Sequence, residues 1–233
     1  MKRLAIIPAR SGSKRIKNKN IKSFLGKPVI DYSIELAKNF KLFDEIHIST
    51  DSKKYINIAE KHGIKNKFLR PKNLSGDKTP LFDVMKFVVK KYESLNFIFD
   101  EIFLISSCNP LMDLKNLKLA YQLFIKNKKK YPVMPVLKYS VPVQWALSLK
   151  NNKINSYFNN ELNKRSQKFN DQYYDSASFY IFPRNIINYK SVKEYANNFI
   201  GFEISQFDSV DIDNKDNWLL AEALYTFKRN NEK

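Results

Sequence analysis

A short basic loop near the N-terminus has the residue types that bind a phosphate. The apolar run Leu4 to Ile7 leads directly into the segment Pro8 to Arg15, PARSGSKR. Arg10 can grip two oxygens of an anion at once, whereas Lys14 acts as a point charge. Gly12 allows the backbone to approach a phosphate, and its neighbours can offer amide N–H groups. The predicted phosphate-binding residues are Ala9, Arg10, Ser11, Gly12, Ser13 and Lys14.

This loop matches neither of two common nucleotide motifs. The P-loop requires a different glycine spacing and a Lys-Ser/Thr ending, and the dinucleotide fingerprint requires more glycines than Gly12 alone. An ordinary basic surface loop is the alternative. The position directly after a first strand counts against that alternative, because ligands of open α/β sheets bind beyond the carboxyl ends of the strands.

Two carboxylates near the C-terminus have the spacing of a divalent-cation site. In the segment Val210 to Asp213, VDID, alternation places Asp211 and Asp213 on the same side of a predicted strand. Mg²⁺ prefers oxygen ligands, bridges phosphate oxygens and offsets the charge on a leaving group. Two solvated carboxylates at a strand end are the alternative. Asp216 is assigned instead to the start of the next helix, where a negative charge is favourable.

The elements that must position these residues alternate between strands and helices. Apolar spacing predicts strands at 4–7, 45–49, 101–106, 132–137, 178–182 and 199–204, and helices at 29–40, 53–62, 80–95, 114–124 and 215–228. Repeated β-α-β units predict an α/β fold in three layers, with a mostly parallel sheet between helices. The pattern weakens over residues 140–175, which we interpret as an excursion from the sheet; a hairpin that meets another subunit is one form that it could take. Residues 1–233 are expected to form a single domain.

The composition is that of a globular chain. Its 233 residues, 43% of them hydrophobic, suffice for one α/β domain with a full core. No apolar run reaches the ~18 residues of a membrane span, and the N-terminal apolar stretch is too short for a signal peptide. The single cysteine, Cys108, cannot form an internal disulfide. We therefore expect a cytoplasmic protein without a membrane partner.

The net charge of +18 raises a second class of function, a basic nucleic-acid-binding protein. Such proteins tend to use arginine for bidentate contacts. Only 7 of the 41 basic residues are arginines, however, and the lysines are spread along the whole chain. The excess of lysine is therefore interpreted as a general compositional bias, and no nucleic-acid partner is expected. An acidic substrate would still benefit from the positive field.

The two predicted sites together resemble those of the acylneuraminate cytidylyltransferases. The first motif runs from Ile7 to Lys14 and continues in Lys19-Asn20-Ile21. The segments Gly26-Lys27-Pro28, Ser49-Thr50-Asp51, Leu69-Arg70-Pro71 and Asp211-Ile212-Asp213 follow in the family's order, so the resemblance covers nearly the whole chain. It implies a Rossmann-like nucleotidyltransferase fold, and the family usually forms dimers through an excursion like residues 140–175.

The resemblance also implies roles for the site residues. Arg10 and Lys14 would be the catalytic residues that hold the triphosphate of CTP, and Asn20 and Arg70 would contact the nucleotide. Asp211 and Asp213 would bind Mg²⁺. The reaction would join the CMP part of CTP to an acidic nine-carbon sugar and release pyrophosphate, mainly through positioning and charge stabilisation. No side chain stands out as the general base, because His47 and His62 are interpreted as structural or exposed.

The sugar is indicated by two departures from the sialic acid enzymes. Those enzymes carry Gln-Pro-Thr-Ser-Pro-Leu where this chain has residues 106–111, SSCNPL, so Ser106 replaces the glutamine that would meet the sugar. Residues 140–147, SVPVQWAL, and 164–167, KRSQ, resemble the pseudaminic acid cytidylyltransferases instead. That resemblance implies the sugar-binding residues Ser106, Gln144, Arg165 and Gln167.

Several alternatives stay open for the substrate. Arg165 fits a sugar carboxylate, but it could equally be an exposed loop arginine. Trp145, Tyr174 and Ser178 differ from the pseudaminic acid pattern, so sialic acid, legionaminic acid or the eight-carbon sugar Kdo remain alternatives within the same chemistry. A non-catalytic sugar-binding module is a further alternative, and the intact loop and carboxylates argue against it.

Overall fold

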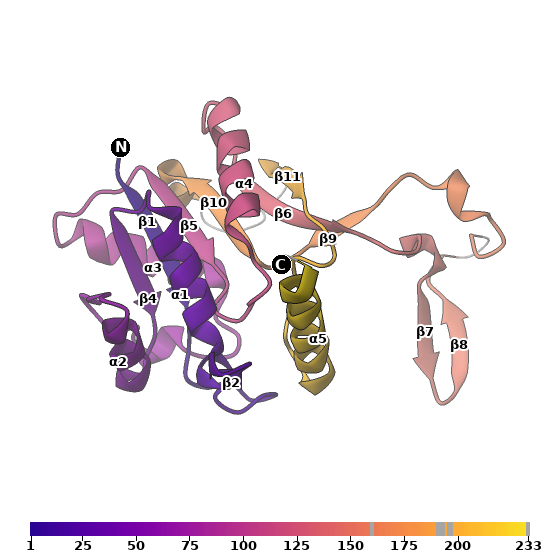
Figure 1. Ribbon diagram of the computed structural model, residues 1–233. Helices are drawn as coiled ribbons and strands as arrows, with labels where there is room; N and C mark the ends of the chain where they lie inside the picture. Colours follow the sequence, from indigo (N-terminus) through magenta and orange to yellow (C-terminus); the bar gives the residue numbers. More distant parts are fainter. Residues whose placement is uncertain (159–160, 190–193, 195–197, 232–233) are drawn as a thin grey trace.

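A central sheet of seven strands organises the molecule. The computed structural model describes residues 1–158, 161–189, 194 and 198–231. The strands are β1 (Arg3–Pro8), β4 (Glu45–Ser49), β5 (Glu101–Ile105), β6 (Val133–Lys138), β9 (Tyr173–Asp175), β10 (Phe179–Pro183) and β11 (Ile200–Glu203). Their order is β11-β6-β10-β5-β1-β4, and β9 pairs with β6 (Figure 1).

The sheet is mostly parallel, as predicted. β1 runs parallel to both β4 and β5, which are joined to it through helices. β10 runs antiparallel to its neighbours β5 and β6, and β11 runs parallel to β6. β6 and β11 therefore point the same way as β1. Only β9 and β10 are reversed among the described strands of this sheet, and both follow the long excursion, whose described residues form no α-helix.

Helices cover the sheet on both faces, which confirms the three-layer prediction. They are α1 (Val29–Phe40), α2 (Lys53–Lys61), α3 (Leu81–Glu93), α4 (Leu114–Lys126) and α5 (Lys215–Asn231). Side chains alternate along β1, so Ala5 and Ile7 pack with α1, α2 and α4, whereas Leu4 and Ile6 pack with α3. A third cluster, which includes Trp218 of α5 and Phe24, closes the end of the sheet where the predicted loop lies. No helix in the described ranges is long and apolar enough to cross a membrane.

Short elements complete the main body. The loop after β1 contains the 3-10 turn η1 (Lys19–Ile21) and a two-stranded ribbon of β2 (Ser23–Phe24) and β3 (Lys27–Pro28). Two further 3-10 turns are η2 (Lys72–Leu74), which precedes α3, and η5 (Arg184–Asn188), which follows β10.

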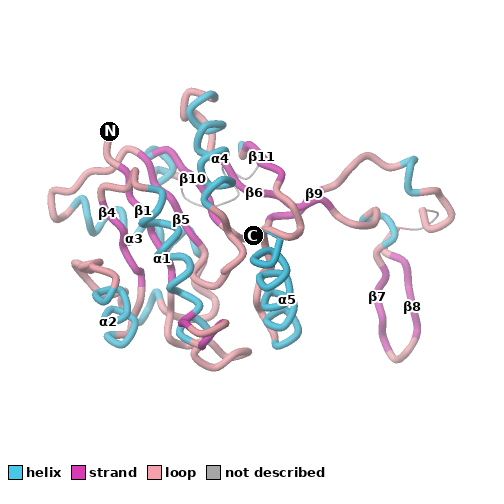
Figure 2. The backbone as a smooth tube through the Cα atoms, viewed as in Figure 1, coloured by secondary structure: helices cyan, strands magenta, loops and turns pink. Residues whose placement is uncertain are grey.

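The predicted excursion is an arm that projects from the sheet. We define the arm as residues 139–172; it leaves β6 and returns through β9 (Figures 1 and 2). The backbone N–H of Tyr139 donates to the carbonyl of Gln172 at its base (2.8 Å). The arm contains η3 (Val143–Trp145), η4 (Ser166–Lys168) and a hairpin of β7 (Leu147–Lys150) and β8 (Lys153–Ser156), so the hairpin prediction is confirmed. Residues 159–160 of the excursion lie outside the described residues.

The prediction of a strand through Val210 to Asp213 is wrong. Ile212 is buried, and its neighbours Asp211 and Asp213 are more exposed, so the alternation holds. The segment nevertheless joins no strand, because side chains satisfy its backbone. Lys19 Nζ donates to the carbonyl of Ile212 (2.7 Å), and the N–H of Asp213 donates to Asn217 Oδ1 (3.3 Å).

The start of α5 also differs from the prediction. Asn214, rather than Asp216, caps the helix, since its Oδ1 accepts from the N–H of Asn217 (2.8 Å). Asp216 lies in the first turn, where its charge still favours the helix.

Candidate active site

A cavity of about 280 Å³ lies at the carboxyl ends of β1, β4 and β5. Pro8, the last residue of β1, and Ser107, which follows β5, line it directly. Arg70 also lines the cavity, and its side chain is bonded to Ser49, the last residue of β4. This is the edge at which open α/β sheets bind ligands.

The cavity brings together residues predicted from opposite ends of the chain. Six of the predicted site residues line it: Arg10, Ser13, Lys14, Asn20, Arg70 and Asp213. The basic loop and the acidic segment therefore share one cavity. Ala9, Ser11 and Gly12 belong to the same loop, but they are not among the lining residues, and neither is Asp211.

The loop backbone is held by the protein itself, which differs from the predicted amide cradle. The N–H and Oγ of Ser11 both donate to Asp51 (2.8 Å each), and the N–H of Ser13 donates to the carbonyl of Ser11 (3.0 Å). Burial would raise the pKa of Asp51, but the two bonds from Ser11, a backbone bond of Asp51 itself and the charge of Arg70 together lower it. Asp51 is thus a charged anchor for the loop, and cationic side chains rather than these two amides are available to an anion.

Asn20 also anchors this loop. Its side chain is buried, and its Nδ2 donates to the carbonyl of Arg10 (3.1 Å). The hydroxyl of Ser107 lies 3.0 Å from Asn20 Oδ1 and 2.7 Å from the carbonyl of Pro8. Through these bonds, the end of β5 fixes where the loop leaves β1.

Arg70 places a buried cation in the cavity. Only 5% of the residue is exposed. Its Nε donates to Ser49 Oγ (3.1 Å), and its Nη2 donates to the carbonyl of Ser49. Burial lowers its pKa to about 10; nearby Asp51 opposes this shift and Arg10 adds to it. No carboxylate in the described part of the chain forms an ion pair with Arg70, so an anionic ligand would relieve the cost of burying this charge.

The two predicted metal ligands lie beside the basic loop. Asp213 Oδ1 accepts from Arg15 Nη2 (2.9 Å) and from Lys19 Nζ (3.5 Å). Burial, followed by the negative charge of Asp213, raises the pKa of Asp211, so a cation near both groups would be stabilised. Within the described residues, no group of three or more His, Cys, Asp or Glu is placed to hold a metal. One or two carboxylates suffice for a Mg²⁺ that also binds phosphates, so the pair fits that ion.

The predicted sugar-binding residues do not meet in this cavity. Ser106 lies after β5, where its N–H donates to the carbonyl of Ser178 (2.8 Å) and its own carbonyl accepts from Ser33 Oγ (2.6 Å). Gln144, Arg165 and Gln167 lie on the arm, away from the cavity of the same chain (Figure 1). Gln167 lines a separate hollow of about 410 Å³ near the base of the arm.

Sequence reasoning missed several residues of the cavity. Arg15 and Lys19 are two further cations in the predicted loop, and their charge was a usable signal. Asp77 and Thr79 also line the cavity, from the connection before α3. Nothing in the local sequence marks Asp77, because it is a single acid in a polar stretch.

Known proteins resemble this chain in sequence and in fold. The family model described as Cytidylyltransferase matches residues 4–231. A pseudaminic acid cytidylyltransferase of Campylobacter jejuni is 40% identical over 181 residues, which cover 77% of this chain and 78% of that protein. An N-acylneuraminate cytidylyltransferase of Escherichia coli is 28% identical over 99% of this chain and 53% of its own length. A solved CMP:2-keto-3-deoxy-manno-octonic acid synthetase complexed with CTP is similar in fold, with a TM-score of 0.72 at 16% identity over 98% of this chain and 100% of that one.

The fold, the cavity at its carboxyl edge and these similarities agree. The sheet and its helical layers are those expected of a Rossmann-like nucleotidyltransferase. The matched residues include both the basic loop and the acidic segment. This chain therefore belongs to the cytidylyltransferase family and is a nucleotidyltransferase enzyme.

Proposed function

We propose that this enzyme transfers the CMP part of CTP to pseudaminic acid, an acidic nine-carbon sugar, and releases pyrophosphate. The choice of sugar is supported by the similarity to pseudaminic acid cytidylyltransferases of Campylobacter jejuni, at 40% identity. Legionaminic acid is one alternative, since a CMP-N,N'-diacetyllegionaminic acid synthase of Legionella pneumophila is 29% identical over 96% of both chains.

One observation carries the proposal: five cations and only two carboxylates line a single cavity. The cations are Arg10, Lys14, Arg15, Lys19 and Arg70, and the carboxylates are Asp77 and Asp213, of which Asp213 lies near Asp211. A triphosphate needs this density of positive charge, because charge builds on the leaving pyrophosphate during transfer.

The residues of the chain would divide the work of the reaction. The anomeric hydroxyl oxygen of the sugar attacks the α-phosphorus of CTP, and the bond from that phosphorus to the oxygen that bridges to the β-phosphate breaks. Pyrophosphate leaves with the bridging oxygen, and the hydroxyl proton passes to water. Arg10 and Lys14 would hold the triphosphate and stabilise the leaving pyrophosphate, whereas Arg70 would hold the nucleotide. Asp211 and Asp213 would hold Mg²⁺, which supplies charge neutralisation at the phosphates when bound.

A second copy of the chain is part of the proposal. The arm exposes large apolar side chains, among them Leu149 (72% exposed), Ile154 (63%) and Tyr157 (69%). Apolar groups gathered on a projecting segment are typical of an interface. A homodimer would cover them, and it would give the arm residues Gln144, Arg165 and Gln167 a substrate site to reach. A cytoplasmic location, supported by the single cysteine, stays a prediction.

Pyrophosphate release tests the proposal. The full chain is assayed with CTP, Mg²⁺ and a panel of pseudaminic, legionaminic and sialic acids and Kdo. We expect turnover with the highest kcat/KM for pseudaminic acid, and a loss of at least about a hundredfold in Arg10→Ala. Lys90→Ala, which removes an exposed cation in the last turn of α3, is the control and should retain activity. Absence of turnover with every sugar would refute the proposed function.

A further inference from the structure

Asp77 lies in the cationic part of the cavity. Its Oδ1 accepts from Arg10 Nη1, and its Oδ2 lies 2.5 Å from Lys14 Nζ. One carboxylate thus bridges two cations that come from a loop more than sixty residues earlier in the chain. Asp77 lines the cavity together with Gly76 and Thr79, so this connection faces the basic loop across it.

The bridge uses the same donors that the proposed reaction assigns to the triphosphate. A carboxylate offers two anionic oxygens to Arg10 and Lys14, as a phosphate does. The bonds from Lys14 and then Arg10 lower the pKa of Asp77, so the carboxylate is charged at neutral pH and competes as an anion. Both sets of bonds cannot form fully at once, because each places an oxygen against the same N–H groups.

The position of Asp77 makes it displaceable. It lies between η2 and α3, outside any helix or strand. Its side chain is 36% exposed and that of Lys14 is 81% exposed, so water replaces the broken bonds readily. Arg70, in contrast, is buried and fixed to Ser49, and it would stay in place when the bridge opens.

We propose that Asp77 is a positioning residue that acts as an internal competitor for the triphosphate. In the free enzyme it holds Arg10 and Lys14 over the cavity, and an incoming polyphosphate displaces it. When pyrophosphate leaves, the carboxylate returns to the two cations and favours release. The inference rests on the proposed function, because that function supplies the polyphosphate.

A purely structural role for Asp77 makes the opposite prediction. If the bridge only orders the loop, its loss frees Arg10 and Lys14 to spread in solvent, and polyphosphate affinity falls. If Asp77 competes, its loss removes an anion that the ligand must displace, and the affinity rises. The direction of the change therefore separates the two roles.

Binding of tripolyphosphate to the full chain tests this without the sugar. Isothermal titration calorimetry is run in EDTA with the wild type, Asp77→Asn and Asp77→Ser. We expect both variants to bind tripolyphosphate about two- to tenfold more tightly than the wild type, since two exposed ion pairs no longer compete. Asp83→Asn is the matched control: it removes an exposed carboxylate in the first turn of α3 and should change the affinity less than twofold.

Three results would overturn the inference. Affinity of the Asp77 variants that is equal to or lower than that of the wild type contradicts competition. An equal gain in tripolyphosphate affinity in Asp83→Asn would show that the effect arises from the change in net charge alone. A gain that persists in the Arg10→Ala, Lys14→Ala background would show that it does not arise from the bridge.

These failures can be told apart from failure of the proposed function. Wild-type turnover with CTP and a nonulosonic acid, combined with no gain in Asp77→Asn, rejects the competitor role alone. Failure of the wild type to bind tripolyphosphate or to use CTP rejects both. Denaturation midpoints of the Asp77 variants within a degree or two of the wild type, the range for an exposed site, are the folding check.

Discussion

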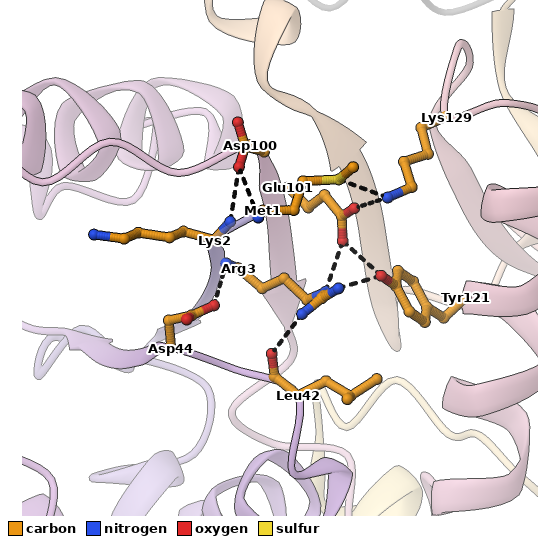
Figure 3. A network of polar contacts seen from close by, with 9 residues as sticks. All are labelled: Met1, Lys2, Arg3, Leu42, Asp44, Asp100, Glu101, Tyr121 and Lys129. Carbon is orange, nitrogen blue, oxygen red and sulfur yellow. Dashed lines mark hydrogen bonds and ion pairs between the residues drawn. The ribbon is translucent and has the colours of Figure 1, made fainter.

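Replacing Glu101 by alanine should strongly destabilise the fold. Glu101 begins β5 at the end of the sheet opposite the cavity, and the residue is 1% exposed. Its Oε2 accepts from Arg3 Nε (3.0 Å) and from the hydroxyl of Tyr121 (2.8 Å), and its Oε1 pairs with Lys129 (Figure 3). One buried carboxylate therefore joins β1, β5, α4 and the turn after α4.

The expected loss is about 3 kcal/mol of the free energy of unfolding. Removing one partner of a buried ion pair typically costs about 3–5 kcal/mol. The side chains of Arg3 and Lys129 are 23% and 24% exposed, so both recover part of their hydration once the carboxylate is gone. That places the loss near the low end of the range. In a domain of this size it corresponds to a fall in Tm of about 6–12 °C.

Urea denaturation of Glu101→Ala, followed by circular dichroism, measures this loss. Glu93→Ala is the control, because its pair with Arg184 (2.8 Å) leaves the two side chains 27% and 42% exposed. Such a pair contributes about 0.2–1 kcal/mol. Turnover of CTP at low temperature should be unchanged in Glu101→Ala, since the network lies far from the cavity. A loss below about 1 kcal/mol, no larger than that of the control, would refute the role assigned to burial here.

Three further outcomes are expected. The pKa of buried His47 is lowered to about 3 from 6.5, mainly by burial, so below pH 6.5 the unfolded chain takes up a proton that the folded chain does not. The free energy of unfolding should therefore fall as pH drops below 6.5, by up to about 1.4 kcal/mol per pH unit. In His47→Leu, the urea midpoint should lose this contribution to its pH dependence. Leu149→Lys should convert the proposed homodimer to a monomer in light scattering; a monomeric wild type would contradict the dimer, and an unchanged dimer mass would remove this hairpin from the interface. Ser209 is buried two residues before Asp211, and its Oγ accepts from Asn109 Nδ2 (2.7 Å) and from Ser178 Oγ (3.0 Å). Because these bonds hold the segment that carries the proposed Mg²⁺ ligands, Ser209→Ala should raise the Mg²⁺ concentration for half-maximal activity several-fold, with little change in the KM for the sugar.

The parts of the site that sequence predicted are those whose chemistry is local. Arg10 and Lys14 lie in one short loop after a strand, so a few adjacent residues carry both the charge and the placement. The layers of the fold could also be predicted from the sequence, because alternation in strands and helical spacing in α1, α3 and α4 indicate which faces are buried.

The rest depends on contacts between distant segments. Alternation at Asp211 and Asp213 predicts a strand, but alternation needs only one buried side chain, here Ile212, and does not determine backbone pairing. Asp77 meets Arg10 across sixty-seven positions of the chain, and a single acid in a polar stretch gives no sign of such a contact. The reversal of β10 follows from the arm, since a connection without a helix does not require a parallel strand.

The proposed homodimer would join the arm of one chain to the cavity of another. The cavity contains the cations that a triphosphate needs, but three of the four residues expected to recognise the sugar lie on a segment that projects from the body. Burying the apolar side chains of that segment would be favourable by roughly 25 cal/mol for each Å² removed from water. Covering them with a second copy would stabilise the arm and fix its polar residues in position at the same time. Nucleotide binding should therefore persist in a monomeric variant such as Leu149→Lys, whereas sugar turnover should fall with the dimer; equal loss of CTP binding and sugar turnover would contradict this division between the cavity and the arm.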